Sequence, residues 1–141
     1  MNEQANIDVV RQCYDALKAG DIQRMMSYFA DDIDWDIPEV EGIAFTGKRH
    51  GRDQVAQFFE LLNQMQEIRG FEVQDCIAQG DKVVAIGHYA FTVKSTGLGF
   101  EADWASLFTV ANGKITRFKE FTDRLGAARA YHPEAALTGK G

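Results

Sequence analysis

Hydrophobic residues in the first half of the chain recur at three- and four-residue spacing, which is typical of helices with one buried face. The first run has its apolar positions at Ile7, Val10, Tyr14 and Leu17. Gly20 can end that helix, and Asp21 can cap a second, short one, because glycine adopts the left-handed conformation easily and aspartate accepts backbone N–H bonds. A third run carries Val55, Phe58, Phe59, Leu62 and Met65. The pattern therefore predicts three N-terminal helices.

From Phe71 onward the period changes to two, which predicts strands. Four alternating segments, 71–79, 82–95, 100–110 and 114–123, are separated by the turn signals Gly-Asp, Thr-Gly-Leu-Gly and Asn-Gly. Short connections of this kind join antiparallel strands. An earlier alternating segment, IDWDI at 33–37, ends at Pro38 and predicts one more strand. Helices followed by a meander predict an α+β fold, with the helices packed on one face of a curved sheet.

Composition narrows the class of protein. The 141 residues, 45% of them hydrophobic, predict a single domain over 1–141 with a core of about 5–131 and a loose tail ending LTGKG. A net charge of −6 argues against a nucleic-acid partner, and no apolar run approaches the ~20 residues that span a membrane. The start shows no secretory signal, and two cysteines build no disulfide framework, so we expect a cytoplasmic protein.

Several familiar motifs are absent from the chain. The loop GIAFTGKR at 42–49 resembles a phosphate-binding loop until Arg49, which replaces the magnesium-binding Ser or Thr, so a loop at the rim of a pocket is the better interpretation. His50, His88 and His132 lack the spacing of metal ligands, and we expect no metal. Ser106 and Cys76 have no visible base beside them, so nucleophilic catalysis has no support.

The order of motifs resembles the nuclear transport factor 2-like superfamily, in particular its SnoaL-like and ketosteroid isomerase-related branch. The resemblance covers roughly residues 5–131. It rests on the strand with Trp35, the phrase FTGKRHGRD before an aromatic helix, and the closing segment NGKITRFKEFTD. It implies a cone-shaped fold, with three N-terminal helices packed on a strongly curved, mixed but mainly antiparallel sheet that encloses a hydrophobic pocket. Because both faces of the predicted sheet are apolar, we expect a homodimer through the outer face.

The resemblance also implies candidate catalytic residues. SnoaL-like cyclases use an aspartate of the last strand as a proton-abstracting base, and this position is Asp123; their partner histidine would fall near Ser106. In limonene-epoxide-hydrolase-like relatives the closing strand ends similarly, and their charged partners correspond to Ala90 and Thr92, which carry no charge. The comparison nevertheless implies that His88, Ala90 and Thr92 face the cavity. His88 could then donate a hydrogen bond to a developing enolate oxygen.

Each candidate has an alternative role. Asp123 can instead cap the helix that begins near Leu125, and His88 can be a hydrogen-bonded structural residue. The predicted substrate-binding set combines ring-bearing residues and the two small residues of the His88 strand: Trp35, Tyr14, His50, Phe58, Ala90, Thr92, Trp104 and Phe121. Most of its aromatic members can equally be core residues. In related isomerases a phenol at the position of Tyr14 is offered to an oxyanion, and His50 could gate the pocket mouth.

Three hypotheses about function follow. The first is an isomerase or cyclase, ahead of a lyase or hydrolase, that transfers a proton on a small apolar carbonyl compound without a cofactor. The second is a protein that only binds such a molecule, and the third is a protein-interaction scaffold of the same fold. A pocket acid with a raised pKa would favour the first, a pocket without ionisable groups the second, and a filled cone the third.

Overall fold

The computed structural model describes residues 2–133, which form helices and a six-stranded sheet. The helices are α1 (Glu3–Lys18), α2 (Ile22–Met26), α3 (Arg52–Met65) and α4 (Arg124–Tyr131). The strands are β1 (Phe29–Ile37), β2 (Gly47–His50), β3 (Gln66–Gln79), β4 (Lys82–Val93), β5 (Gly99–Ala111) and β6 (Lys114–Thr122). No helix in this part of the chain is long and apolar enough to cross a membrane. The tail segment LTGKG lies outside the described residues.

The sheet has the order β2-β1-β6-β5-β4-β3. Strands β3 to β6 form the expected antiparallel meander, and β1 joins its far edge by pairing parallel with β6. The predicted α+β fold with a curved, mixed sheet is therefore confirmed. Helix α4 follows the three N-terminal helices and is the one that the sequence placed near Leu125. The short strand β2, which pairs antiparallel with β1, is additional to the predicted elements.

The predicted turns and caps are confirmed in detail. Asn112 and Gly113 both have positive φ, 53° and 77°, as a two-residue hairpin turn between β5 and β6 requires. The Asp21 carboxylate accepts a hydrogen bond of 3.0 Å from the Arg24 N–H and so caps α2. These local signals fix the turn between β5 and β6 and the start of α2.

Gly87 in β4 permits the strong curvature of the sheet. A Cβ atom at this position would lie 2.0 Å from the Glu72 carbonyl oxygen and 2.5 Å from the indole ring of Trp104. Bulges in β3, between Ile68 and Gly70 and between Val73 and Asp75, bend the same region further. The Trp104 indole ring and the Glu72 backbone can lie this close to β4 because Gly87 has no side chain.

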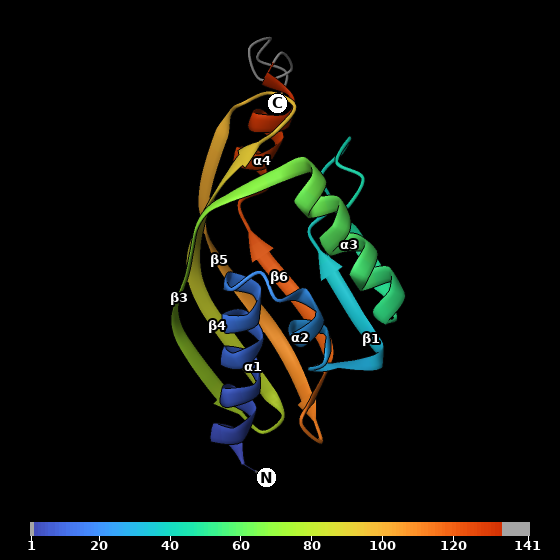
Figure 1. Cartoon of the computed structure of the whole chain (residues 1–141). Coiled ribbons are helices and arrows are strands. Elements are labelled where there is room, and N and C mark those ends of the chain that lie inside the picture. The colour runs from blue at the N-terminus through green and yellow to red at the C-terminus, as the bar shows by residue number, and fades with distance from the viewer. Residues whose placement is uncertain (1, 134–141) are drawn as a thin grey trace.

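The two faces of the sheet have different surroundings. The concave face packs against α1, which lies within the curve of the sheet, and α3 lies beside β1 while α4 closes one end (Figure 1). The convex face leaves large apolar side chains in solvent, with Ile77 56%, Ile86 37% and Phe121 50% exposed. A homodimer through this face stays a prediction. The concave face holds the cavity.

Candidate functional site

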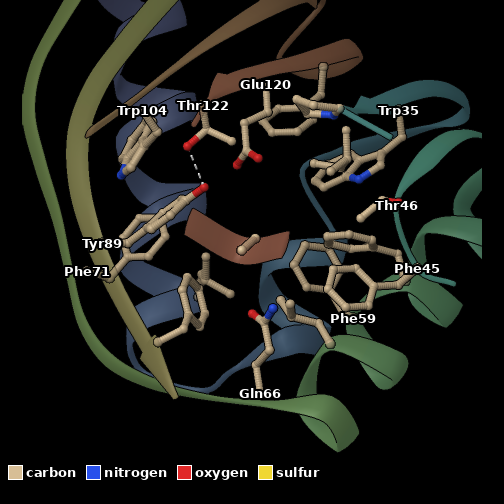
Figure 2. Close-up of a pocket in the computed structure, with 18 of the residues that line it drawn as sticks. Trp35, Phe45, Thr46, Phe59, Gln66, Phe71, Tyr89, Trp104, Glu120 and Thr122 are labelled. Atoms are coloured by element: carbon tan, nitrogen blue, oxygen red, sulfur yellow. Dashed lines mark hydrogen bonds between the residues drawn. The ribbon is translucent and has the colours of Figure 1, made fainter. Parts of the chain in front are cut away.

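A cavity of about 120 Å³ lies between the concave face of the sheet and the helices. This volume is somewhat smaller than the roughly 150 Å³ of an apolar cavity that holds benzene. Its wall is mainly aromatic and includes Phe29, Trp35, Phe58, Phe71, Phe91 and Trp104. Figure 2 shows Phe71, Tyr89 and Trp104 on one side and Trp35, Phe45 and Phe59 on the other. The aromatic wall, more than the volume, suits the cavity to a small, ring-containing ligand.

The Glu120 carboxyl group is the central polar feature of the cavity. In β6, Phe118, Glu120 and Thr122 alternate on the concave face, so the side chain of Glu120 points into the cavity (Figure 2). Its carboxylate forms no hydrogen bond or ion pair within residues 2–133. Burial raises the pKa of Glu120 from 4.5 to about 7, because the apolar surroundings disfavour the charged form. A carboxyl group of this kind can gain or lose a proton near neutral pH.

Two phenols lie near Glu120. The Tyr89 hydroxyl donates a hydrogen bond of 2.8 Å to Thr122 Oγ1. The Tyr14 ring packs against Trp104, with centroids 5.2 Å apart. Burial raises the pKa of both phenols, and the Glu120 carboxylate raises each further. Both therefore stay protonated at neutral pH and can act only as hydrogen-bond donors or acceptors.

A thiol also lines the cavity. Burial raises the pKa of Cys13 to about 12, so this group stays protonated and is a poor nucleophile. Within residues 2–133, no three side chains of His, Cys, Asp and Glu gather as a metal-ligand set. Of the groups in the cavity wall whose pKa burial raises, Glu120 alone titrates near neutral pH.

Asp123 lies at the edge of this cavity and caps α4. Its Oδ1 atom accepts a hydrogen bond of 2.9 Å from the Leu125 N–H, with an extended backbone at Asp123 that is typical of an N-cap. The capping role that the sequence left open is therefore the one observed. The side chain also contributes to the cavity wall near Arg124. A catalytic role for Asp123 stays a prediction, and its carboxylate already has a structural partner.

His88 lies on the convex face, so the prediction that it faces the cavity is wrong. Its Nδ1 and Nε2 atoms each lie 2.9 Å from a carboxylate oxygen, of Asp103 and Glu101 respectively. These two hydrogen bonds raise the pKa of His88. The strand places Tyr89 and Phe91 inside and His88 outside, because successive side chains point to opposite faces.

The same inversion affects other predicted site residues. Ala90 and Thr92 share the convex face with His88, and Thr92 accepts a hydrogen bond from Arg69 there. Phe121 lies on that face as well, with the Lys119 ammonium 5.2 Å from its ring centroid. The expectation that these three residues face the cavity is therefore wrong. The sequence interpretation chose the wrong inward face for both β4 and β6. In β6 it therefore placed Phe121 in the cavity, where the structure has its neighbours Glu120 and Thr122.

The remaining predicted residues divide between cavity and surface. Tyr14, Trp35, Phe58 and Trp104 line the cavity, as expected. Trp35 stacks on Phe118 with ring centroids 4.0 Å apart, and its indole N–H has no hydrogen-bond partner within residues 2–133. His50 lies in β2, away from the cavity wall, with its Nδ1 atom 2.8 Å from Asp34. Substrate binding by these residues stays a prediction.

The loop between β1 and β2 forms one rim of the cavity, as the sequence predicts, through Ile43, Phe45 and Thr46. The Thr46 hydroxyl donates to the Ile43 carbonyl at 2.8 Å and accepts from the Val40 N–H at 3.0 Å. Opposite this loop, Arg124 at the start of α4 donates a hydrogen bond of 3.2 Å to the Glu39 carbonyl. The loop is therefore held by its own side chain and by α4.

Comparison with known proteins agrees with this fold. The sequence model of the SnoaL-like domain matches residues 10–118. This chain belongs to the SnoaL-like family. The crystal structure of an NTF2-like protein from Burkholderia xenovorans is 33% identical, covers 92% of this chain and 98% of its own, and superposes with a TM-score of 0.83.

Two further relatives extend the comparison. A candidate SnoaL-like polyketide cyclase from Mesorhizobium loti is 25% identical, covers 82% of this chain and 97% of its own, and has a TM-score of 0.69. An uncharacterised protein from Mycobacterium tuberculosis is 28% identical over 123 residues, which cover 86% of this chain and 91% of the relative. The relatives support the nuclear transport factor 2-like architecture of this SnoaL-like protein.

Sequence reasoning missed Glu120 as a site residue of this SnoaL-like protein. The segment FKEFTD offers two apolar faces, one with Phe118 and one with Phe121, and the family motif drew attention to its final aspartate. Strand β5, which pairs with β6, held a usable signal. Its buried face consists of Trp104, Ser106 and Phe108, and Ser106 lies opposite Glu120. Carrying the buried face of one strand to the next across the hairpin would have placed Glu120 inside.

Proposed function

We propose that the cavity binds a small, largely apolar carbonyl compound and that Glu120 transfers a proton on it, in a cofactor-free isomerisation or cyclisation. The observation that carries this proposal is a carboxyl group inside an aromatic cavity that has no partner within residues 2–133 and whose pKa is raised to about 7. A carboxylate in water has too low a pKa to be an efficient base at neutral pH, and burial raises that pKa toward neutrality. The Mesorhizobium loti relative supports a reaction of this class.

The proposed chemistry assigns one step to each polar group. The Glu120 carboxylate removes a proton from the carbon next to the ligand carbonyl, and the electron pair of that C–H bond moves onto the carbonyl oxygen as an enolate. Tyr14 or Tyr89 donates a hydrogen bond to that oxygen, as a protonated phenol can. In an isomerisation of an unsaturated ketone, the enolate is conjugated with the C=C bond and Glu120 returns the proton to the far carbon of that bond. In a cyclisation, the enolate carbon attacks a second carbonyl group of the same ligand, whose C=O π electrons move onto its oxygen, and that oxygen takes the proton back from Glu120.

The non-catalytic alternatives have weaker support. The cavity contains an ionisable group with a raised pKa, which a purely apolar binding site does not need. The cone is also hollow rather than filled, contrary to what the scaffold hypothesis expects. A ligand-binding role without turnover is therefore best treated as an outcome of the experiment.

The test uses 2-indanone, a small ketone whose protons next to the carbonyl exchange with deuterium when an enolate forms. We expect the wild-type protein to accelerate this exchange in D₂O, followed by NMR against a protein-free sample. Glu120→Gln should lower the accelerated rate by about 10²-fold or more, the usual contribution of a general base. Asp123→Asn, which keeps a capping side chain, should leave the rate nearly unchanged.

Two results would contradict the proposal. If 2-indanone binds but wild-type and Glu120→Gln proteins exchange its protons at the protein-free rate, the catalytic part fails and the binding hypothesis remains. If Asp123→Asn loses the acceleration while Glu120→Gln keeps it, the base has been assigned to the wrong carboxylate.

A further inference from the structure

Gln66 forms a second polar pole of the cavity, opposite Glu120. The residue is buried, 6% exposed, and lines the cavity wall. Figure 2 shows the Gln66 amide and the Glu120 carboxylate pointing into the cavity from opposite sides, with aromatic rings flanking the space between them. A buried polar side chain that points into an apolar cavity needs a partner to offset its desolvation.

The backbone holds Gln66 in this place. Its N–H donates to the Leu62 carbonyl at the end of α3, and the residue opens β3 by pairing with Val93 of β4. Because the backbone on both sides of the residue is fixed by secondary structure, the Cα–Cβ bond has a fixed direction, toward the cavity that the side chain lines. The amide is therefore a built part of the wall rather than an accidental neighbour.

The surroundings of Gln66 leave hydrogen-bonding capacity for a ligand. The Tyr131 hydroxyl lies close enough that Gln66 lowers its pKa, although burial raises the pKa of Tyr131 to about 12 overall. No partner of good hydrogen-bond geometry satisfies that hydroxyl within residues 2–133. A primary amide offers two donors and two acceptor lone pairs. One neighbouring hydroxyl cannot use all of them, so the amide can bind a ligand oxygen while it contacts Tyr131.

Resting on the function proposed above, we propose that Gln66 determines specificity by binding a second oxygen at the far end of the ligand. The ligand class is then a flat ring compound with one oxygen-bearing group at each end. One end lies beside Glu120, Tyr14 and Tyr89, where the proton is transferred. The other donates to or accepts from the Gln66 amide, and the aromatic walls hold the ring between the two poles.

The experiment compares probes that differ only in the second oxygen. Phenol and hydroquinone form one pair, and 2-naphthol and 2,6-dihydroxynaphthalene form a longer one, so that two separations between the poles are sampled. Affinity is measured by calorimetry for the wild-type protein and for Gln66→Met, which keeps the length of the side chain without its polar atoms. The indole NMR signals of Trp35 and Trp104, the only tryptophans in the chain, report whether each probe occupies the cavity.

We expect the wild-type protein to bind the two-oxygen member of at least one pair roughly three- to tenfold more tightly, the usual net effect of one hydrogen bond. In Gln66→Met this preference should vanish, while the affinity for the one-oxygen probe stays within about twofold. If Gln66→Met does not fold, Gln66→Asn serves instead, because its shorter amide should weaken the same preference.

The possible failures separate the two proposals. If one-oxygen probes bind and the wild-type protein shows no preference in either pair, or if Gln66→Met keeps the preference, the role of Gln66 is overturned while the proposed function stands. If no probe perturbs the indole signals, the cavity does not take flat ring compounds, which overturns this inference and contradicts the proposed ligand class together. Loss of deuterium exchange in Glu120→Gln remains an independent measure of the catalytic proposal.

Discussion

The two faces of the sheet each carry an ionisable group with a raised pKa, for opposite physical reasons. On the convex face, hydrogen bonds to Asp103 and Glu101 raise the pKa of His88 because they stabilise its charged form. On the concave face, desolvation raises the pKa of Glu120 because it destabilises the charged form. Of the two groups, only the Glu120 carboxyl lacks a partner in the part of the chain that the structure describes, and it is therefore free to exchange a proton with a ligand.

This difference shows why the partners of a side chain matter more than its residue type. His88 is the residue that chemical intuition selects as an acid or base, yet both of its ring nitrogens are occupied and it faces solvent. Glu120 is an ordinary residue type in an unusual place. The two faces should therefore differ in how substitutions change the free energy of unfolding and its dependence on pH.

The largest effect is expected at Gly87, whose missing side chain lets the concave face close over Trp104. Gly87→Ala places a Cβ atom 2.0 Å from the Glu72 carbonyl oxygen, a backbone atom that cannot move without bending the sheet. We expect a loss of about 3 kcal/mol or more in the free energy of unfolding, measured in urea. Gly70→Ala in β3 is the matched control, because a Cβ atom there meets no atom of residues 2–133 within 4 Å. Equal losses in both variants would contradict this account of the curvature.

The next effect concerns Glu120 and has a defined pH dependence. The folded protein holds the Glu120 proton until about pH 7, whereas the unfolded chain releases it near 4.5. Since the folded state binds more protons in that interval, stability falls as the pH rises through it, by at most about 3 kcal/mol. Glu120→Gln should match the wild-type stability near about pH 4 and exceed it near about pH 8.

The control for that comparison is Glu60→Gln, on the exposed side of α3. Urea unfolding of all three proteins at both pH values measures the difference. A Glu120→Gln variant that is less stable than wild type near about pH 8 would mean that the buried carboxylate has a stabilising partner.

A smaller effect is expected from the cap of α4. Asp123→Ala removes the acceptor for the Leu125 N–H and should cost about 1 kcal/mol in the free energy of unfolding. Asp123→Asn should recover most of that loss, because asparagine caps helices as well as aspartate does. Thermal unfolding of the three proteins measures this. A large loss in deuterium exchange with either variant, in a folded protein, would show that Asp123 has a role in the cavity as well.

The smallest effect is expected at His88, and it lies in a different pH range. A raised pKa means that the folded state stabilises the protonated ring, so this stability is present below the unfolded pKa and is lost as the pH rises through the folded pKa. His88→Gln should therefore slightly destabilise the protein at acidic pH and leave it unchanged at alkaline pH. Glu101, Asp103 and the cross-strand neighbour Glu72 surround the ring in solvent. A change in deuterium exchange with His88→Gln would contradict its placement outside the cavity.

The fold was largely predictable because its signals are local. The alternation of apolar and polar residues from Phe71 onward predicted the antiparallel meander, and the pair Asn112-Gly113 predicted its last turn. Strand β2 was missed because GKRH has no apolar alternation; it exists because the edge of β1 offers backbone groups to pair with. The predicted helix start after Asp123 is also confirmed by its cap.

The site was less predictable because the inward face depends on packing between distant strands. Strand β4 has apolar residues on both faces, so periodicity alone could not choose between Tyr89 and His88. The family motif then favoured the wrong face of β6 and selected Asp123 and Phe121 in place of Glu120. Gln66 could not be predicted as a site residue, because a glutamine between a helix and a strand is usually exposed. Its burial results from tertiary packing, which the local sequence does not show.

The central claim is that Glu120 is a desolvated base in the cavity, and the titration of its carboxyl carbon tests it most directly. With ¹³C-labelled glutamate and Glu120→Gln for assignment, NMR should show one glutamate that titrates near pH 7, far above the ordinary 4.5. The rate of 2-indanone deuteration should rise over the same pH interval, since only the carboxylate removes a proton. A Glu120 carboxyl that titrates at its ordinary pKa, or a deuteration rate that does not follow its ionisation, would contradict the account.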